Sequence, residues 1–209
     1  AASDVYKRQD LENITRLTNT NRAMVSDLRA AKAEVERLKK EFLEIGKEVF
    51  DSVEKPEDVL HKMQTEPSMR YESKEQMLQL AEDTIERAYK PLAEWFTVFP
   101  KAPCKVLPVP TQSEKHAPPA YYFPPLPDGS RDGTYFLNTY KAETKSIFEA
   151  ESVAFHEAIP GHHLQNALSL ENDTLSLYRK FGYYTSAFGE GFSNALAEGR
   201  QKIETTSLE

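Results

Sequence analysis

Apolar residues recur in alternating steps of three and four from Ile14 to Val49. Asn21 is the one polar residue in this series, which spans about five heptads and is typical of a helix face packed on a partner. The pattern predicts one or two long helices. It is compatible with an intermolecular coiled coil or with an antiparallel hairpin or bundle edge inside one subunit. The second interpretation is favoured, because later segments offer apolar faces to pack against.

Two further helix starts are marked by local signals. The segment Lys55–Asp58 places a proline near the first turn of a short helix. Ser73 followed by Gln76 is a capping-box pattern, which predicts a helix continuing to Trp95. Pro91 lies inside that helix, where a proline can introduce a kink.

The character of the chain changes over residues 99–134, which hold most of its prolines. The segment Asp128–Gly133 is rich in Asp and Gly and is expected to form a turn, and the apolar stretch Thr134–Asn138 follows it. Three extended segments are expected here, at residues 105–110, 121–125 and 134–138. They predict a small β-element around residues 103–138 inside a helical protein, because helical patterning resumes near Lys145.

Composition supports a mainly α fold and narrows the class of function. The chain has 209 residues and only 8 glycines, and its many Glu, Lys, Leu and Ala residues favour helices. Its net charge is −7 without a basic run, so nucleic acid is not expected as a partner. Cys104 is the single cysteine, which excludes an internal disulfide and a multi-cysteine metal site. No apolar run approaches the ~20 residues of a membrane-spanning helix.

The segment His156–Gln165 concentrates metal-binding chemistry. It contains three of the five histidines, and Glu157 follows the first of them directly. Neutral imidazole is a common zinc ligand, and a neighbouring glutamate can act as a general base. The usual zinc-peptidase motif places two histidines four residues apart on one helix. Here Pro160 occupies that second position, so the geometry must differ.

Periodicity leaves two candidates for the second ligand. On an unbroken helix, His163 returns to within ~20° of His156 around the axis. Pro160-Gly161 interrupts the helix, however, and a bulge at this point would bring His162 to the metal instead. The residues alone do not decide between the two histidines.

A third ligand is expected from a later helix, which holds Glu190, Asn194 and Glu198. Glu190 and Asn194 lie four residues apart and therefore share a helix face. A His–His–Glu set would leave the fourth zinc position for water, which is the arrangement of a catalytic site. Asn194 would then orient a ligating histidine as a hydrogen-bond partner that does not itself bind the metal.

The ten residues HEAIPGHHLQ resemble the signature of bacterial domain-of-unknown-function family 885, which is regarded as a family of zincin-like metallopeptidases. That signature runs His-Glu-x-x-Pro-Gly-His. The resemblance covers most of residues 70–200. It continues in segments that follow the expected order, at residues 73–93, 101–106, 120–122 and 128–139.

The resemblance implies a ligand set and a scaffold. The family's histidine after Pro-Gly falls on His162, and Glu190-Gly191-Phe192 matches the start of its Glu-Gly-Trp-x-x-Tyr-x-Glu segment, with Phe for Trp. By this resemblance, Zn²⁺ is bound by His156, His162 and Glu190 on a helical, gluzincin-like scaffold. Glu198 lies one residue later than the family's second glutamate and receives no role.

The expected function is that of a zinc-dependent hydrolase acting on a peptide substrate, with Glu157 as general base. His163 and Tyr184 are candidate donors to the oxyanion, and Tyr183 is a candidate for that role or for substrate binding. Arg131 would bind a substrate carboxylate, or it is a turn residue paired with a neighbouring aspartate.

Two other functional interpretations stay open at the level of sequence. One is a non-catalytic binding module on a peptidase-like scaffold. The other is a helical interaction protein that acts through the heptad region, with the histidines incidental.

The chain is expected to be an interior piece of a longer protein and part of one larger domain. The stretch DVYKRQ resembles the read-through translation of a sequencing adapter, so residues 1–9 are expected to be an artefact. The remainder divides into a helical region, a proline-rich segment with short strands, and truncated active-site helices, at residues 10–98, 99–140 and 141–209.

Overall fold

The computed structural model describes residues 2–182 and 185–206. The chain divides into two compact units, Ala1–Thr65 and Glu66–Glu209. It is mainly helical, and its described part contains one small three-stranded sheet, as the sequence predicts. Among the described residues, no helix combines the length and the apolar character that crossing a membrane requires.

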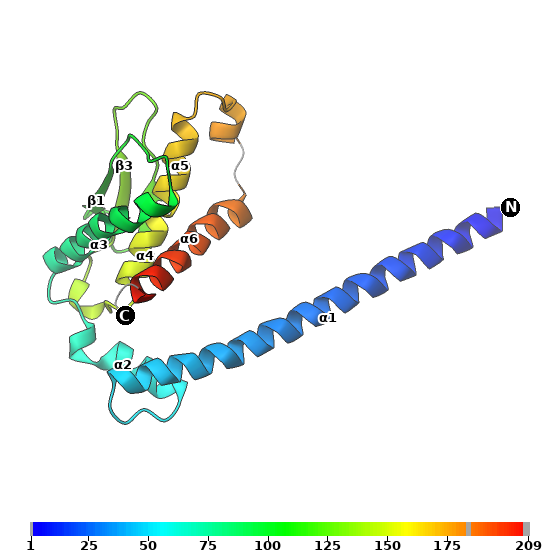
Figure 1. The fold of residues 1–209 in the computed structure, drawn as a ribbon, viewed down its shortest axis with the longest axis horizontal. Helices are drawn as coiled ribbons and strands as arrows, with labels where there is room; N and C mark the ends of the chain where they lie inside the picture. The colour runs from blue at the N-terminus through cyan, green and yellow to red at the C-terminus, as the bar shows by residue number, and fades with distance from the viewer. Residues whose placement is uncertain (1, 183–184, 207–209) are drawn as a thin grey trace. The chain divides into compact units, whose positions relative to one another are not determined.

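The first unit consists of the long helix α1 (Ala2–Val49) and the short helix α2 (Pro56–Thr65), shown in blue and cyan in Figure 1. The heptad pattern therefore lies on one continuous helix, which corrects the expectation of a hairpin in that region. The physical reason is that no proline and only one glycine interrupt the sequence between Ile14 and Val49. Heptad side chains such as Leu28 are exposed.

Contact between the two helices of this unit is concentrated near the end of α1. Gly46 is buried there, and a Cβ atom added to it would lie 2.3 Å from Cγ2 of Val59 on α2. Asp58 stabilises the start of α2, because its carboxylate accepts hydrogen bonds from the backbone N–H groups of Glu54 and Lys55 at 3.1 and 3.2 Å. The close approach of Val59 to α1 requires a glycine at position 46.

The second unit contains a sheet with helices packed on it. The strands are β1 (Cys104–Pro108), β2 (Ala120–Phe123) and β3 (Gly133–Leu137), in the order β1-β3-β2. β1 pairs with β3 in parallel, and β2 pairs with β3 antiparallel, with Tyr122 opposite Tyr135. These strands occupy the region for which the sequence predicts a small β-element.

Within the described residues, four α-helices belong to this unit: α3 (Lys74–Trp95), α4 (Ala150–Glu157), α5 (His162–Glu171) and α6 (Ser186–Thr206). The predicted cap of α3 is confirmed, because the Ser73 hydroxyl accepts a hydrogen bond from the Gln76 backbone N–H at 3.1 Å. The helix continues past Pro91. Short helical segments lie at Pro67–Met69, Ala142–Thr144 and Tyr178–Gly182.

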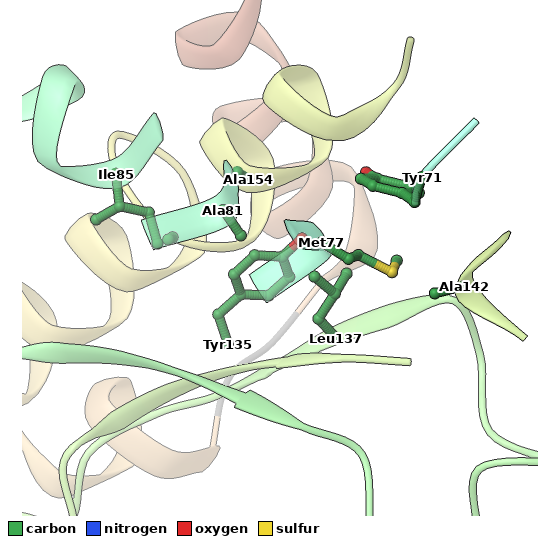
Figure 2. Close-up of a cluster of buried hydrophobic side chains, with 9 residues drawn as sticks. Tyr71, Met77, Ala81, Ile85, Tyr135, Leu137, Ala142 and Ala154 are labelled. Carbon is green, nitrogen blue, oxygen red and sulfur yellow. The ribbon is translucent and has the colours of Figure 1, made fainter. Parts of the chain in front are cut away.

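The core of the second unit lies between the sheet and the helices α3 and α4. Alternate residues of β3, Tyr135 and Leu137, point toward Met77 and Ala81 of α3 (Figure 2). A second cluster joins α3 to α4 and α5 through Phe155, Ile159 and Leu164 together with Ala88 and Leu92. α6 packs against α4 and α5, beside which it runs in Figure 1. The core thus fixes the two helices that contain the histidines.

We expect Gly46→Ala to loosen the packing of α2 on α1. The new methyl group would overlap the stiff, β-branched Val59, and such overpacking costs ~1–3 kcal/mol. Amide protons of α2 should then exchange ~5–150-fold faster. The double variant with Val59→Ala should recover most of the protection, because the overlapping methyls are gone. Unchanged exchange in Gly46→Ala alone would contradict the close contact.

Candidate metal centre

The segment between α4 and α5 folds back on the end of α4. The Gly161 N–H donates to the Phe155 carbonyl at 2.9 Å, and the His163 N–H donates to the Ala158 carbonyl at 3.0 Å. The Ile159–Pro160 peptide bond is cis. A Cβ atom on Gly161 would lie 1.9 Å from the carbonyl oxygen of His156. Only glycine permits this approach, after which the chain resumes a helix at His162.

This turn brings three predicted ligands together. Oε2 of Glu190 lies 3.2 Å from Nε2 of His156 and 3.5 Å from Nε2 of His162. The two imidazole rings are nearly perpendicular, with centroids 4.6 Å apart. One ligand atom from each residue lies within 4.8 Å of the other two. The side chains thus converge from α4, α5 and α6.

The donor set and its spacing fit a zinc ion. Two imidazole nitrogens and one carboxylate oxygen are the protein ligands of many catalytic zinc sites. Ligand atoms ~2.0–2.1 Å from a tetrahedral ion lie ~3.3 Å from one another. The separations of 3.2 and 3.5 Å match that value. His156, His162 and Glu190 would therefore hold the ion with little rearrangement.

α6 also supplies the groups that orient both imidazoles. Oδ1 of Asn194 lies 2.8 Å from Nδ1 of His156, so this nitrogen carries the proton and Nε2 is left for the metal. Oγ of Ser193 lies 2.9 Å from Nδ1 of His162, where the hydroxyl can accept from the ring or donate to it. Asn194 occupies its predicted place behind a ligand. Ser193 is fully buried, and the sequence predicted no role for it. Its spacing of three residues from Glu190 places it on the same helix face, and this spacing could have identified it.

Burial sets the charge states at the centre. Desolvation lowers the pKa of His162, the nearby His156 lowers it further, and Glu190 opposes both effects. The neutral form of His162, which is the metal-binding form, is therefore favoured. Desolvation raises the pKa of Glu157, while His156 opposes and Glu190 adds to this shift. A raised carboxyl pKa suits a group that must accept and return a proton.

His163 has a different environment from the one predicted. Its side chain is fully buried, with Nδ1 2.8 Å from the Tyr122 hydroxyl and Nε2 2.9 Å from the Ala102 carbonyl. Both ring nitrogens therefore have partners within the protein, and neither is directed to the three ligands. This geometry corrects the expectation that His163 donates to an oxyanion, because both ring nitrogens are already hydrogen-bonded to Tyr122 and Ala102.

Arg131 is not one of the three clustered residues, and two predicted tyrosines lie outside the described residues. Arg131 is exposed and donates from Nη2 to the Pro124 carbonyl at 2.9 Å, with its guanidinium 5.7 Å from the Phe123 ring centroid. No aspartate pairs with it among the described residues, and its predicted role in binding a substrate carboxylate stays a prediction. Tyr183 and Tyr184 lie outside the described residues.

Comparison with known proteins places the chain among bacterial proteins. One protein family, described as "Bacterial protein of unknown function (DUF885)", matches residues 12–193. No curated protein matches the chain.

A crystal structure described as that of "the putative lipoprotein from Colwellia psychrerythraea" is similar, with a TM-score of 0.75 and 26% sequence identity. The similarity covers 82% of this chain and 30% of that one, so the chain spans less than a third of that protein's length.

We expect Ser193→Ala and Asn194→Ala each to weaken zinc binding by ~10–100-fold, because each removes the partner that orients a ligating imidazole. Zinc affinity measured by competition with a chromophoric chelator tests this. Ser186→Ala is the matched control, since Ser186 is an exposed serine at the start of the same helix. Equal affinities for the control and the Ser193 variant would contradict the orienting role.

Proposed function

The chain belongs to the DUF885 family of bacterial proteins, and we propose that it carries the centre of a zinc-dependent hydrolase that cleaves peptide bonds. The observation that carries this proposal is the convergence of His156, His162 and Glu190 beside the carboxylate-bearing Glu157. A three-residue ligand set leaves one position open, which distinguishes catalytic from structural zinc sites.

Accessibility supports a reaction at this centre. The side chain of Glu190 is 47% exposed, whereas those of His156 and His162 are 21% and 12% exposed. The ligands are thus anchored in the protein on the histidine side and open to solvent on the glutamate side. A substrate carbonyl and a water molecule could therefore reach the centre from the side of α6.

Each residue then has a defined part in hydrolysis. Zinc bound at this centre would lower the pKa of a water molecule toward ~7 and polarise the scissile carbonyl. Glu157 takes a proton from the attacking water and delivers it to the leaving amine. Asn194 would keep the His156 imidazole in the tautomer that leaves Nε2 unprotonated, and Ser193 would hold the His162 ring in its orientation.

We also propose a zincin-like scaffold for this unit. Its support is that both histidines lie on consecutive helical segments, that the third ligand comes from a later helix packed beside them, and that a small sheet covers the same core. The Pro-Gly turn replaces the single continuous helix of the usual zinc-peptidase motif.

Glu157→Gln separates catalysis from metal binding. We expect zinc content to remain at the wild-type level and hydrolysis of a peptide library to fall by ~10²–10⁴, because the amide cannot accept the proton. His156→Ala is the matched variant that should lose the zinc itself. Hydrolysis that survives unchanged in Glu157→Gln would exclude this mechanism. Wild-type protein that binds zinc but cleaves no peptide would favour a non-catalytic binding module.

A further inference from the structure

A buried chain of hydrogen bonds runs beside the metal centre without reaching it. His163 on α5 links Tyr122 of β2 to the backbone of the segment that precedes β1. The Ala102 carbonyl can only accept, so Nε2 of His163 carries the proton and donates it at 2.9 Å. Nδ1 then accepts from the Tyr122 hydroxyl at 2.8 Å. The neighbours therefore select one tautomer of His163.

Both ends of this chain are fixed. Burial raises the pKa of Tyr122, so its hydroxyl stays protonated and remains a donor. At the other end, the Glu171 carboxylate accepts from the backbone N–H groups of Lys101 and Ala102 at 2.9 Å. The segment before β1 is thus attached to α5 at its first and last turns, through His163 and Glu171.

Gly133 provides the space in which this chain lies. A Cβ atom added to it would lie 2.3 Å from Nδ1 of His163 and 2.9 Å from the Tyr122 hydroxyl oxygen. Gly133 does not have a positive φ, so its conformation does not require glycine. The requirement is steric, because any side chain at this position of β3 would displace the hydrogen-bonded pair.

Tyr122, which belongs to this chain of hydrogen bonds, also contacts the predicted ligand His162. The Tyr122 ring is stacked toward the His162 ring, with centroids 6.4 Å apart and planes 23° apart, and it meets the His163 ring edge-on. His162 and His163 are consecutive residues in the first turn of α5. A residue that holds His163 and contacts His162 is therefore placed to fix the first turn of the helix.

We propose that Tyr122 and His163 are positioning residues for the metal centre, with Gly133 as the residue that makes room for them. Together they set the position of the first turn of α5 against the sheet, and hence the direction of the His162 imidazole toward His156 and Glu190. This inference rests on the proposed function, because it takes the three-residue cluster to be a metal site.

The test is the cobalt absorption spectrum and the zinc affinity of the full chain. Cobalt(II) reports its ligand geometry through its visible bands. We expect Tyr122→Phe to shift those bands and to weaken zinc binding by ~10–100-fold, within the range for groups that orient ligands. Gly133→Ala should have the same effect by steric displacement.

Tyr121→Phe is the matched control. Tyr121 is the preceding residue of β2 and stacks on Phe136, with centroids 5.1 Å apart, on the opposite face of the sheet. It should leave both readouts unchanged. If the Tyr122 and Tyr121 variants behave alike, the positioning role is overturned while the metal site stands. If the wild-type chain binds no metal, the proposed function fails instead.

A measurement on the wild-type chain keeps the proposal testable if Gly133→Ala does not fold. Nitrogen-15 NMR of the histidine rings should show His163 as the Nε2–H tautomer with a slowly exchanging ring proton. A His163 ring with its proton on Nδ1, or with rapid exchange at Nε2, would overturn the proposal.

Discussion

The candidate metal centre depends on the close approach of Gly161 to the carbonyl of His156. A side chain at Gly161 would begin 1.9 Å from that oxygen, so the turn exists only with glycine. Six residues of straight helix rotate a side chain by ~600°, which would leave His162 ~120° away from His156. The turn removes this difference in direction. The two imidazoles consequently face each other with their centroids 4.6 Å apart.

The helix α6 contributes Glu190 and the hydrogen-bond partners of both imidazoles. Glu190, Ser193 and Asn194 stand at positions i, i+3 and i+4, and therefore share one face of the helix. That face supplies the Glu190 carboxylate and one hydrogen-bond partner for each imidazole. The two histidines are thus constrained at both nitrogens by a single element. The arrangement of His156, His162 and Glu190 should therefore depend more on the position of α6 against α4 and α5 than on any single contact of α6.

The sequence predicted local features better than long-range ones. The Ser73 cap and the strands near residues 103–138 follow from neighbouring residues, and the structure confirms them. Periodicity could not choose between His162 and His163, because the choice depends on the backbone path through Gly161. The partners of His163 lie 41 and 61 residues away in the chain, and no local pattern marks them. The continuous α1 was open to two interpretations because a heptad pattern specifies a face but not its partner.

The proposed function depends on the binding of a single zinc ion by His156, His162 and Glu190. An anomalous difference map at the zinc absorption edge, from crystals of the chain grown with zinc, tests it most directly. We expect one peak per chain, ~2.0–2.2 Å from Nε2 of His156, Nε2 of His162 and a carboxylate oxygen of Glu190. A map without a peak at this cluster, or with zinc bound by His163 in place of His162, would contradict it.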